Sequence, residues 1–227
     1  IADVAIAIDC SDELRLSEKS GFYNARHRIV IDHHLTNTAF GDVNYVKPYS
    51  ATAVCIYEIL QALGQPLTPE IAEALYIGIN TDTGRFAHQG TDEYTMSIVA
   101  KLYGAKIDTA LINDKLYKRR SYVKTKLLAE ALGSLKLYHN NKAAVIVLDN
   151  DVFARLQARE TDTEGIVDYG IEVRGVQVAA FIKGVGEKEY KVSLRSKCSG
   201  CNVAKIALKY GGGGHMAAAG CTIRQPI

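Results

Sequence analysis

The stretch Arg28-Ile29-Val30-Ile31-Asp32-His33-His34 decides how the rest of the chain is interpreted. Its first four residues have the apolar pattern of a short buried strand, and an acid and two imidazoles begin where the strand should end. In an open α/β sheet, ligands bind at the carboxyl ends of the strands. Three consecutive side chains that can bind a metal or a phosphate therefore indicate a functional site here. The alternative is a surface turn with a solvated pair of histidines.

Two other stretches supply similar ligands. Val4–Ile8 has the continuous apolar pattern of a parallel strand covered on both faces, and Asp9 follows it. In residues 78–86 a helical pattern breaks into a polar turn that contains Asp82. Asp9, His33 and Asp82 together form a set of oxygen and nitrogen ligands of the kind that suits Mn²⁺ or Mg²⁺.

Near the other end, Gly211–Gly214 is followed by His215. Four consecutive glycines cost backbone entropy, and nothing in the sequence shows a structural demand for them. We interpret the run as a loop that lets a ligand approach the main chain closely.

These motifs occur in a fixed order along nearly all of the chain: Asp9, Asp32-His33-His34, Asn80–Phe86, Ser193–Ser196 and Gly211–Gly220. At these residues the chain resembles the DHH-family phosphoesterases that carry a C-terminal DHHA1 domain. Within that family it is similar to the oligoribonuclease and 3′,5′-bisphosphate nucleotide phosphatase group. The resemblance implies an α/β protein with a parallel-sheet DHH domain, truncated at its N-terminus, and a smaller mixed-sheet α/β DHHA1 domain.

The expected domain boundaries follow the change of pattern along the chain. We expect the DHH domain in residues 1–117 and the DHHA1 domain in residues 135–227. Residues 118–134 are expected to hold a linker helix, because 121–133 is first basic and then apolar. Strands and helices alternate beyond it, and Gly184 and Gly186 predict a hairpin turn.

The resemblance assigns roles to the residues of the first domain. It makes Asp9 the ligand that bridges the ions of a two-metal centre holding Mn²⁺, Mg²⁺ or Co²⁺, and it completes one metal site with His33 and Asp82. His34 resembles the residue that contacts the scissile phosphate, and Asp32 is expected to orient a histidine. For His34, a second metal ligand or a structural hydrogen bond stays open.

Substrate binding is expected mainly in the second domain. Arg195 is suited to a bidentate phosphate contact, and the glycine run can offer N–H groups to an anion. His215 resembles the residue that contacts the terminal nucleotide. Arg85 lies close to Asp82 and could reach the same phosphate or form a surface salt bridge. The candidate binding residues are Arg195, Gly212, Gly213, Gly214, His215 and Arg85.

One family motif has no counterpart in this chain. The family places a His and two Asp upstream of the first strand seen here, whereas this sequence opens at Ile1 without an initiator Met. We expect either a fragment of a longer protein or a protein that has lost the motif. In both cases the chain by itself could be inactive, so a catalytically inactive nucleotide-binding module is an alternative function.

Composition excludes some classes of protein. The formal net charge is +2, so no global basic field indicates duplex DNA binding. No apolar run approaches the roughly 18 residues of a membrane span. Five cysteines, odd in number and scattered, argue against a disulfide framework and for a reducing, cytoplasmic location. Cys198 and Cys201 have the spacing of a metal or redox pair, but without a second pair we favour a loop of free thiols.

The expected function is therefore a metal-dependent phosphoesterase that hydrolyses short oligoribonucleotides, 3′,5′-bisphosphate nucleotides or both. The expected partners are short single-stranded RNA or a nucleotide bisphosphate, with no duplex DNA and no membrane, and a homodimer is compatible with the resemblance. Hydrolysis of a cyclic dinucleotide is the alternative within the same class of enzymes.

Overall fold

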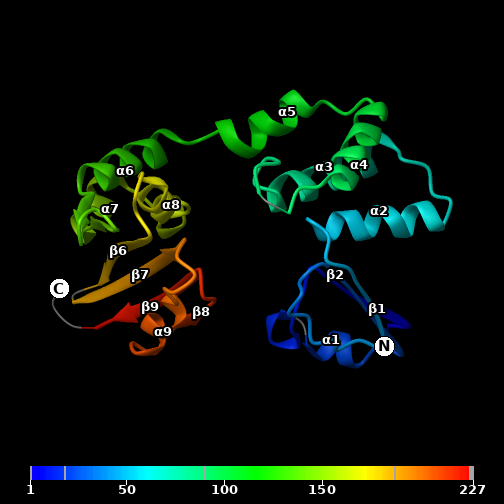
Figure 1. Ribbon diagram of the computed structural model, residues 1–227, viewed down its shortest axis with the longest axis horizontal. Helices are drawn as coiled ribbons and strands as arrows, with labels where there is room; N and C mark the ends of the chain where they lie inside the picture. Colours follow the sequence, from blue (N-terminus) through cyan, green and yellow to red (C-terminus); the bar gives the residue numbers. More distant parts are fainter. Residues whose placement is uncertain (1, 18, 89, 187, 225–227) are drawn as a thin grey trace. The chain divides into compact units, whose positions relative to one another are not determined.

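The computed structural model describes residues 2–17, 19–88, 90–186 and 188–224. The chain forms two compact units, Ile1–Arg119 and Arg120–Ile227, which are described separately below (Figure 1).

The sheet of the first unit has three parallel strands in the order β1-β2-β3. They are β1 (Val4–Ile8), β2 (His27–Asp32) and β3 (Val43–Val46). The register pairs Ile8 with Ile31, so β1 and β2 end side by side. Parallel pairing brings the carboxyl ends of the strands to one edge, and the residues after β1 and β2 therefore meet there.

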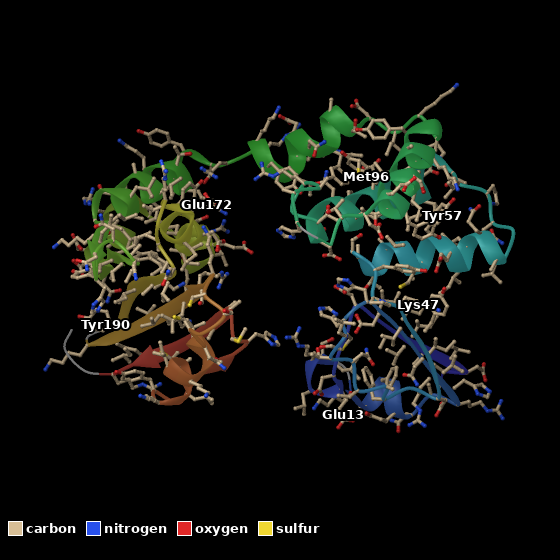
Figure 2. All side chains as sticks on the ribbon, viewed as in Figure 1. Glu13, Lys47, Tyr57, Met96, Glu172 and Tyr190 are labelled. Carbon is tan, nitrogen blue, oxygen red and sulfur yellow. The ribbon has the colours of Figure 1, made fainter. Side chains whose placement is uncertain are left out.

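Helices complete the first unit. They are η1 (Glu13–Arg15), α1 (Lys19–Tyr23), α2 (Thr52–Ala62), α3 (Pro69–Asp82), α4 (Glu93–Gly104), α5 (Thr109–Asn113) and the π-helical turn η2 (Asp114–Lys118). As its sequence predicts, α3 begins with Thr68 as N-cap and Pro69 in the first turn. The helices α2, α3 and α4 share an apolar core that contains Tyr57, labelled in Figure 2, Tyr76 and Leu102.

The expectation that β1 is covered on both faces was wrong for the part of the chain that is described. Val4, Ile6 and Ile8 are 47%, 53% and 54% exposed, whereas Ala7 on the opposite face is buried. The strand lies at the edge of the sheet, with β2 as its neighbour. A strand covered on one face and a strand covered on both faces can each have an unbroken apolar sequence, so hydrophobic periodicity could not distinguish them here.

The second unit has a six-stranded sheet in the order β4-β5-β6-β7-β9-β8. The strands are β4 (Lys136–Tyr138), β5 (Ala143–Leu148), β6 (Val178–Gly186), β7 (Glu189–Ser196), β8 (Gly213–Gly214) and β9 (Ala218–Ile223). Within the described part of this unit, only the β5–β6 pair is parallel, so the sheet is mixed, as expected. The expected hairpin joins β6 to β7.

The helices of this unit are α6 (Tyr122–Gly133), α7 (Asn150–Leu156), η3 (Glu160–Thr163), α8 (Ile166–Glu172) and α9 (Val203–Leu208). Leu127 and Ala131 of α6 are fully buried in the core with Ile146 and Phe181 of the sheet. The helix expected as a linker is thus part of the second unit's core, while the expected boundaries of the two domains stay a prediction. Among the described residues, no helix has both the length and the apolar character to cross a membrane.

Candidate metal centre

Asp9 stands directly after β1 in a left-handed backbone conformation, with φ of 58°. Aspartate is one of the few residues besides glycine that adopt this region. Its N–H donates to the carbonyl of Ile31 at 3.0 Å, and the hydroxyl of Thr52, at the start of α2, donates to its Oδ1 at 2.8 Å. These two bonds hold the Asp9 carboxylate beside the end of β2.

His33 follows β2, and its hydrogen bond determines which ring nitrogen carries the proton. Nδ1 lies 2.9 Å from the main-chain carbonyl of Tyr49, which can only accept, so Nδ1 is the donor. In the neutral ring, Nε2 then carries the lone pair, and it faces Asp9 Oδ1 at 3.7 Å and Asp82 Oδ2 at 4.0 Å. These separations are too long for hydrogen bonds. Ligand atoms that share an ion at roughly 2.1 Å lie about 3–4 Å apart, which is the spacing found here.

His34 is held by Asp32, which is fully buried. His34 Nδ1 lies 2.7 Å from Asp32 Oδ1, and Asn37 Nδ2 donates to Oδ2 at 2.6 Å. Burial opposes ionisation of Asp32, but the hydrogen bonds from Asn37 and His34 outweigh it and hold the pKa of this carboxyl below its ordinary value. An ionised Asp32 keeps the proton on Nδ1 of His34, so Nε2 is left to act on a ligand. The two histidines line a cavity of about 340 Å³ together with Asn37.

Asp9, His33 and His34 converge, because their ligand atoms all lie within 4.8 Å of one another. Asp82, the last residue of α3, approaches this group through His33. Burial raises the pKa of the Asp82 carboxyl, and the negative charge of Asp9 raises it further. A cation bound next to Asp82 would favour its ionised form and so offset both effects.

Arg85 lies in the turn that follows Asp82. Its backbone is left-handed, with φ of 63°, and its guanidinium carbon lies 4.8 Å from the centre of the Tyr117 ring. The Tyr117 hydroxyl donates to the side-chain Oδ1 of the buried Asn80. The main-chain carbonyl of Asn80 accepts a hydrogen bond from the main-chain N–H of Arg85 at 2.8 Å. Of the two alternatives expected, the salt bridge does not occur among the ion pairs of the described residues; the side chain stacks on an aromatic ring instead.

Arg195 on β7 is already engaged within the second unit. Its Nε donates to Asp168 Oδ1 at 2.9 Å, and one Nη donates to the carbonyl of Leu194 at 3.2 Å. The residue lines a cavity of about 480 Å³ with Lys183 and Ser193. A bidentate phosphate contact through Nε would therefore require Asp168 to give way.

The interpretation that no structural demand explains the glycine run was wrong for three of its members, Gly211, Gly212 and Gly214. A Cβ at Gly212 would collide with the carbonyl of Gly220, and one at Gly214 would lie 2.5 Å from the carbonyl of Ala218. Both glycines let the run pack against β9. Gly211 has a left-handed backbone, with φ of 70°, which favours glycine although there is space around it. At Gly213, by contrast, no atom of the described residues other than its chain neighbours lies within 4 Å of an added Cβ. Gly213 is therefore the member of the run that neither packing nor backbone conformation explains.

Comparison with known proteins identifies the family. Residues 152–227 match the DHHA1 domain family. A protein of Thermus thermophilus named bifunctional oligoribonuclease and PAP phosphatase NrnA is 34% identical over 86% of this chain and 58% of the relative. A Streptococcus mutans protein with the same name, marked probable, is 29% identical over 96% of this chain and 69% of its own length.

Residues 152–227 thus belong to the DHHA1 domain family, and most of the chain is similar to DHH-family phosphoesterases. The solved structure of an exopolyphosphatase-related protein from Bacteroides fragilis has the same fold, with a TM-score of 0.90 and 27% identity over 100% of this chain and 68% of that one. The chain spans less than two thirds of the length of the Thermus thermophilus relative.

DHH phosphoesterases depend on metal ions, and the donor set fits such an ion. The Nδ1–H of His33 donates to the main-chain carbonyl of Tyr49, so the neutral ring presents the lone pair of Nε2 to the carboxylates of Asp9 and Asp82. A mixed carboxylate and imidazole set suits Mn²⁺, Mg²⁺ and related divalent ions. The residues that would hold the ion are Asp9, His33 and Asp82.

A hydrogen-bond network around Glu58, next to the candidate metal centre, was not predicted from the sequence. The carboxylate of Glu58 on α2 accepts hydrogen bonds from three tyrosine hydroxyls: Tyr45 at 2.6 Å, Tyr94 at 2.7 Å and Tyr49 at 2.9 Å. Tyr49 is the residue whose carbonyl holds His33. The network thus fixes the segment whose main-chain carbonyl orients the His33 ring. Its members are far apart in the sequence, so no local pattern could have indicated it.

Glu58→Gln is expected to make the folded state less stable at neutral pH. Burial opposes ionisation of Glu58, but the three tyrosine hydroxyls outweigh it and lower the pKa of this carboxyl. A depressed pKa gives stability that is complete above the unfolded value of about 4.3 and is lost as pH falls through the folded value. Unfolding in urea should therefore show a difference between wild type and variant at pH 7 that shrinks below about pH 4. A difference that grows on acidification would contradict this.

Proposed function

We propose that the protein containing this chain is a metal-dependent phosphoesterase that hydrolyses short oligoribonucleotides and 3′,5′-bisphosphate nucleotides. The observation that carries the proposal is the convergence of Asp9, His33 and His34, with ligand atoms within 4.8 Å, at the carboxyl ends of two parallel strands. The names of the Thermus thermophilus and Streptococcus mutans relatives support this choice of substrates.

In the first unit, Asp9, His33 and Asp82 would hold Mn²⁺ or a similar ion. The chemistry that such an ion would supply there is a water of lowered pKa, available as nucleophile at neutral pH, and polarisation of the phosphoryl group. Asp32 keeps the His34 ring in one orientation, and Nε2 of His34 contacts the scissile phosphate, where it stabilises the developing charge.

In the second unit, the substrate is held by its phosphate and its terminal nucleotide. Arg195 lines a cavity with Ser193, and the space beside Gly213 leaves room for an anion to approach the main chain of the glycine run. His215 contacts the terminal nucleotide. Recognition of an end favours small substrates over long ones. The five free cysteines support the cytoplasmic location expected from the sequence.

The test is a panel of substrates assayed with the protein that contains this chain. A 5′-phosphorylated dinucleotide, a longer RNA, adenosine 3′,5′-bisphosphate, a cyclic dinucleotide and a DNA duplex are each incubated with Mn²⁺. We expect hydrolysis of the short RNA and the bisphosphate, none of the duplex, and none of any substrate in EDTA. Undiminished activity in EDTA would refute the metal role, and exclusive hydrolysis of the cyclic dinucleotide would favour the alternative.

His215→Ala separates end recognition from the metal centre in the same assay. We expect KM for the dinucleotide to rise by about tenfold, the equivalent of one charge-assisted contact, while Mn²⁺ affinity stays unchanged. A loss of Mn²⁺ affinity with unchanged KM would show that the residue acts elsewhere.

A further inference from the structure

Two thiols of the second unit take no part in the site described above. Cys198 and Cys201 stand at the two ends of the turn that joins β7 to α9, and both are half-buried free thiols. The N–H of Cys201 donates to the carbonyl of Cys198 at 3.1 Å, which closes a four-residue turn. Cys198 Sγ lies 3.8 Å from the place of a Cβ at Gly200, so this sulfur lies against the turn itself.

The turn already has the dimensions that a disulfide requires. A hydrogen-bonded four-residue turn brings its first and last Cα atoms within about 7 Å, and disulfides span Cα atoms about 4.4–6.8 Å apart. The residues on either side of the turn are held by main-chain hydrogen bonds. The N–H of Lys197 donates to the carbonyl of Gln177 at 2.9 Å, and the N–H of Val203 donates to the carbonyl of Met216 at 3.0 Å. Closure would thus involve the turn and leave the strands in place.

The surroundings also separate the pKa values of the two thiols. The neighbouring Cys201 thiol and the main-chain N–H of Gly200 lower the pKa of the Cys198 thiol, while the neighbouring Cys198 thiol and burial raise the pKa of Cys201. The thiolate is the nucleophile in exchange reactions. Elsewhere, burial raises the pKa of Cys55 to about 11 and also raises the pKa of Cys221, so these thiols are disfavoured as nucleophiles.

We propose that Cys198 and Cys201 form a reversible intrachain disulfide by exchange with small disulfides. The Cys198 thiolate attacks one sulfur of a small disulfide RSSR, whose S–S bond breaks and releases one RSH after protonation. Cys201, deprotonated by solvent, then attacks the Cys198 sulfur of the mixed disulfide and releases the second RSH. Two thiols of the protein are oxidised and one RSSR is reduced to two RSH.

Residues on both sides of the turn are bonded to the segment that follows the glycine run and His215. Ser196 N–H donates to the carbonyl of Ala217 at 2.8 Å, and Val203 N–H donates to Met216, the residue after His215. A disulfide would stiffen the chain beside His215. Any effect on nucleotide binding rests on the proposed function, whereas the thiol chemistry can be measured without substrate.

The test is incubation of the whole chain with oxidised glutathione, followed by an acid quench and titration of thiols in denaturant. We expect the number of free thiols to fall from five to three, with a mass loss of two hydrogen atoms. A proteolytic peptide should link Cys198 to Cys201, and dithiothreitol should restore all thiols. Five remaining thiols, a persistent glutathione adduct, or a link to another cysteine would overturn the proposal.

Two variants serve as matched controls. Cys221→Ser removes a half-buried thiol of the neighbouring β9, and its thiol count should still fall by two. Cys201→Ser removes the second nucleophile, so a glutathione adduct should accumulate at Cys198 without closure. If Cys201→Ser lost two thiols as readily as the wild type, the pairing would be wrong. The wild-type measurement stands even where a variant does not fold.

Discussion

Asp9→Asn is expected to weaken Mn²⁺ binding by roughly 100-fold or more, with little change in the folded structure. Loss of a group that merely orients a metal ligand costs about 10–100-fold in affinity, so loss of a charged ligand should cost at least as much. Asparagine also tolerates the left-handed conformation at this position, and its side-chain oxygen can still accept from Thr52. The change therefore removes the charge and keeps the shape.

Calorimetric titration with Mn²⁺ measures this effect without any need for turnover. Asp3→Asn is the matched control, because Asp3 immediately precedes the same strand, pairs with Arg26 on the surface and is far more exposed. Mn²⁺ affinity should be unchanged in that variant. Equal affinities of Asp9→Asn and the wild type would remove Asp9 from the metal centre and, with it, the basis of the proposed function.

Gly214→Ala is expected to lower the free energy of unfolding by on the order of 3 kcal/mol. Its φ is 142°, a region closed to L side chains, and the added methyl carbon would lie 2.5 Å from the carbonyl of Ala218. Both effects strain the contact between β8 and β9. Urea unfolding followed by circular dichroism gives the difference directly.

Gly213→Ala is the informative partner of that variant. Among the residues that the structure describes, none except its chain neighbours has an atom within 4 Å of the added methyl, so the free energy of unfolding should change by no more than about 1 kcal/mol. If the open face of Gly213 admits an anion, the methyl carbon should weaken binding of adenosine 3′,5′-bisphosphate by about tenfold. A stable Gly213→Ala variant with unchanged nucleotide affinity would mean that the run serves packing alone.

Much of the first unit could be predicted from local signals. Asp32-His33-His34 directly follows an apolar strand, and Thr68-Pro69 opens a helix, because strand ends and helix caps depend on neighbouring residues. The packing of Gly212 and Gly214 could not be predicted. Their partners lie on β9, a strand whose pairing with a glycine pair leaves no mark in hydrophobic periodicity.

The sequence by itself determined which candidate ligands this protein offers and that two of them, Asp9 and His33, follow strands of a parallel sheet. Only the tertiary structure decided how they are used. The carbonyl of Tyr49 selects the tautomer of His33, and Asp168 occupies one edge of the Arg195 guanidinium. Residue type states what a side chain can donate or accept. Which bond it forms depends on neighbours brought together by folding, and these are distant in the chain.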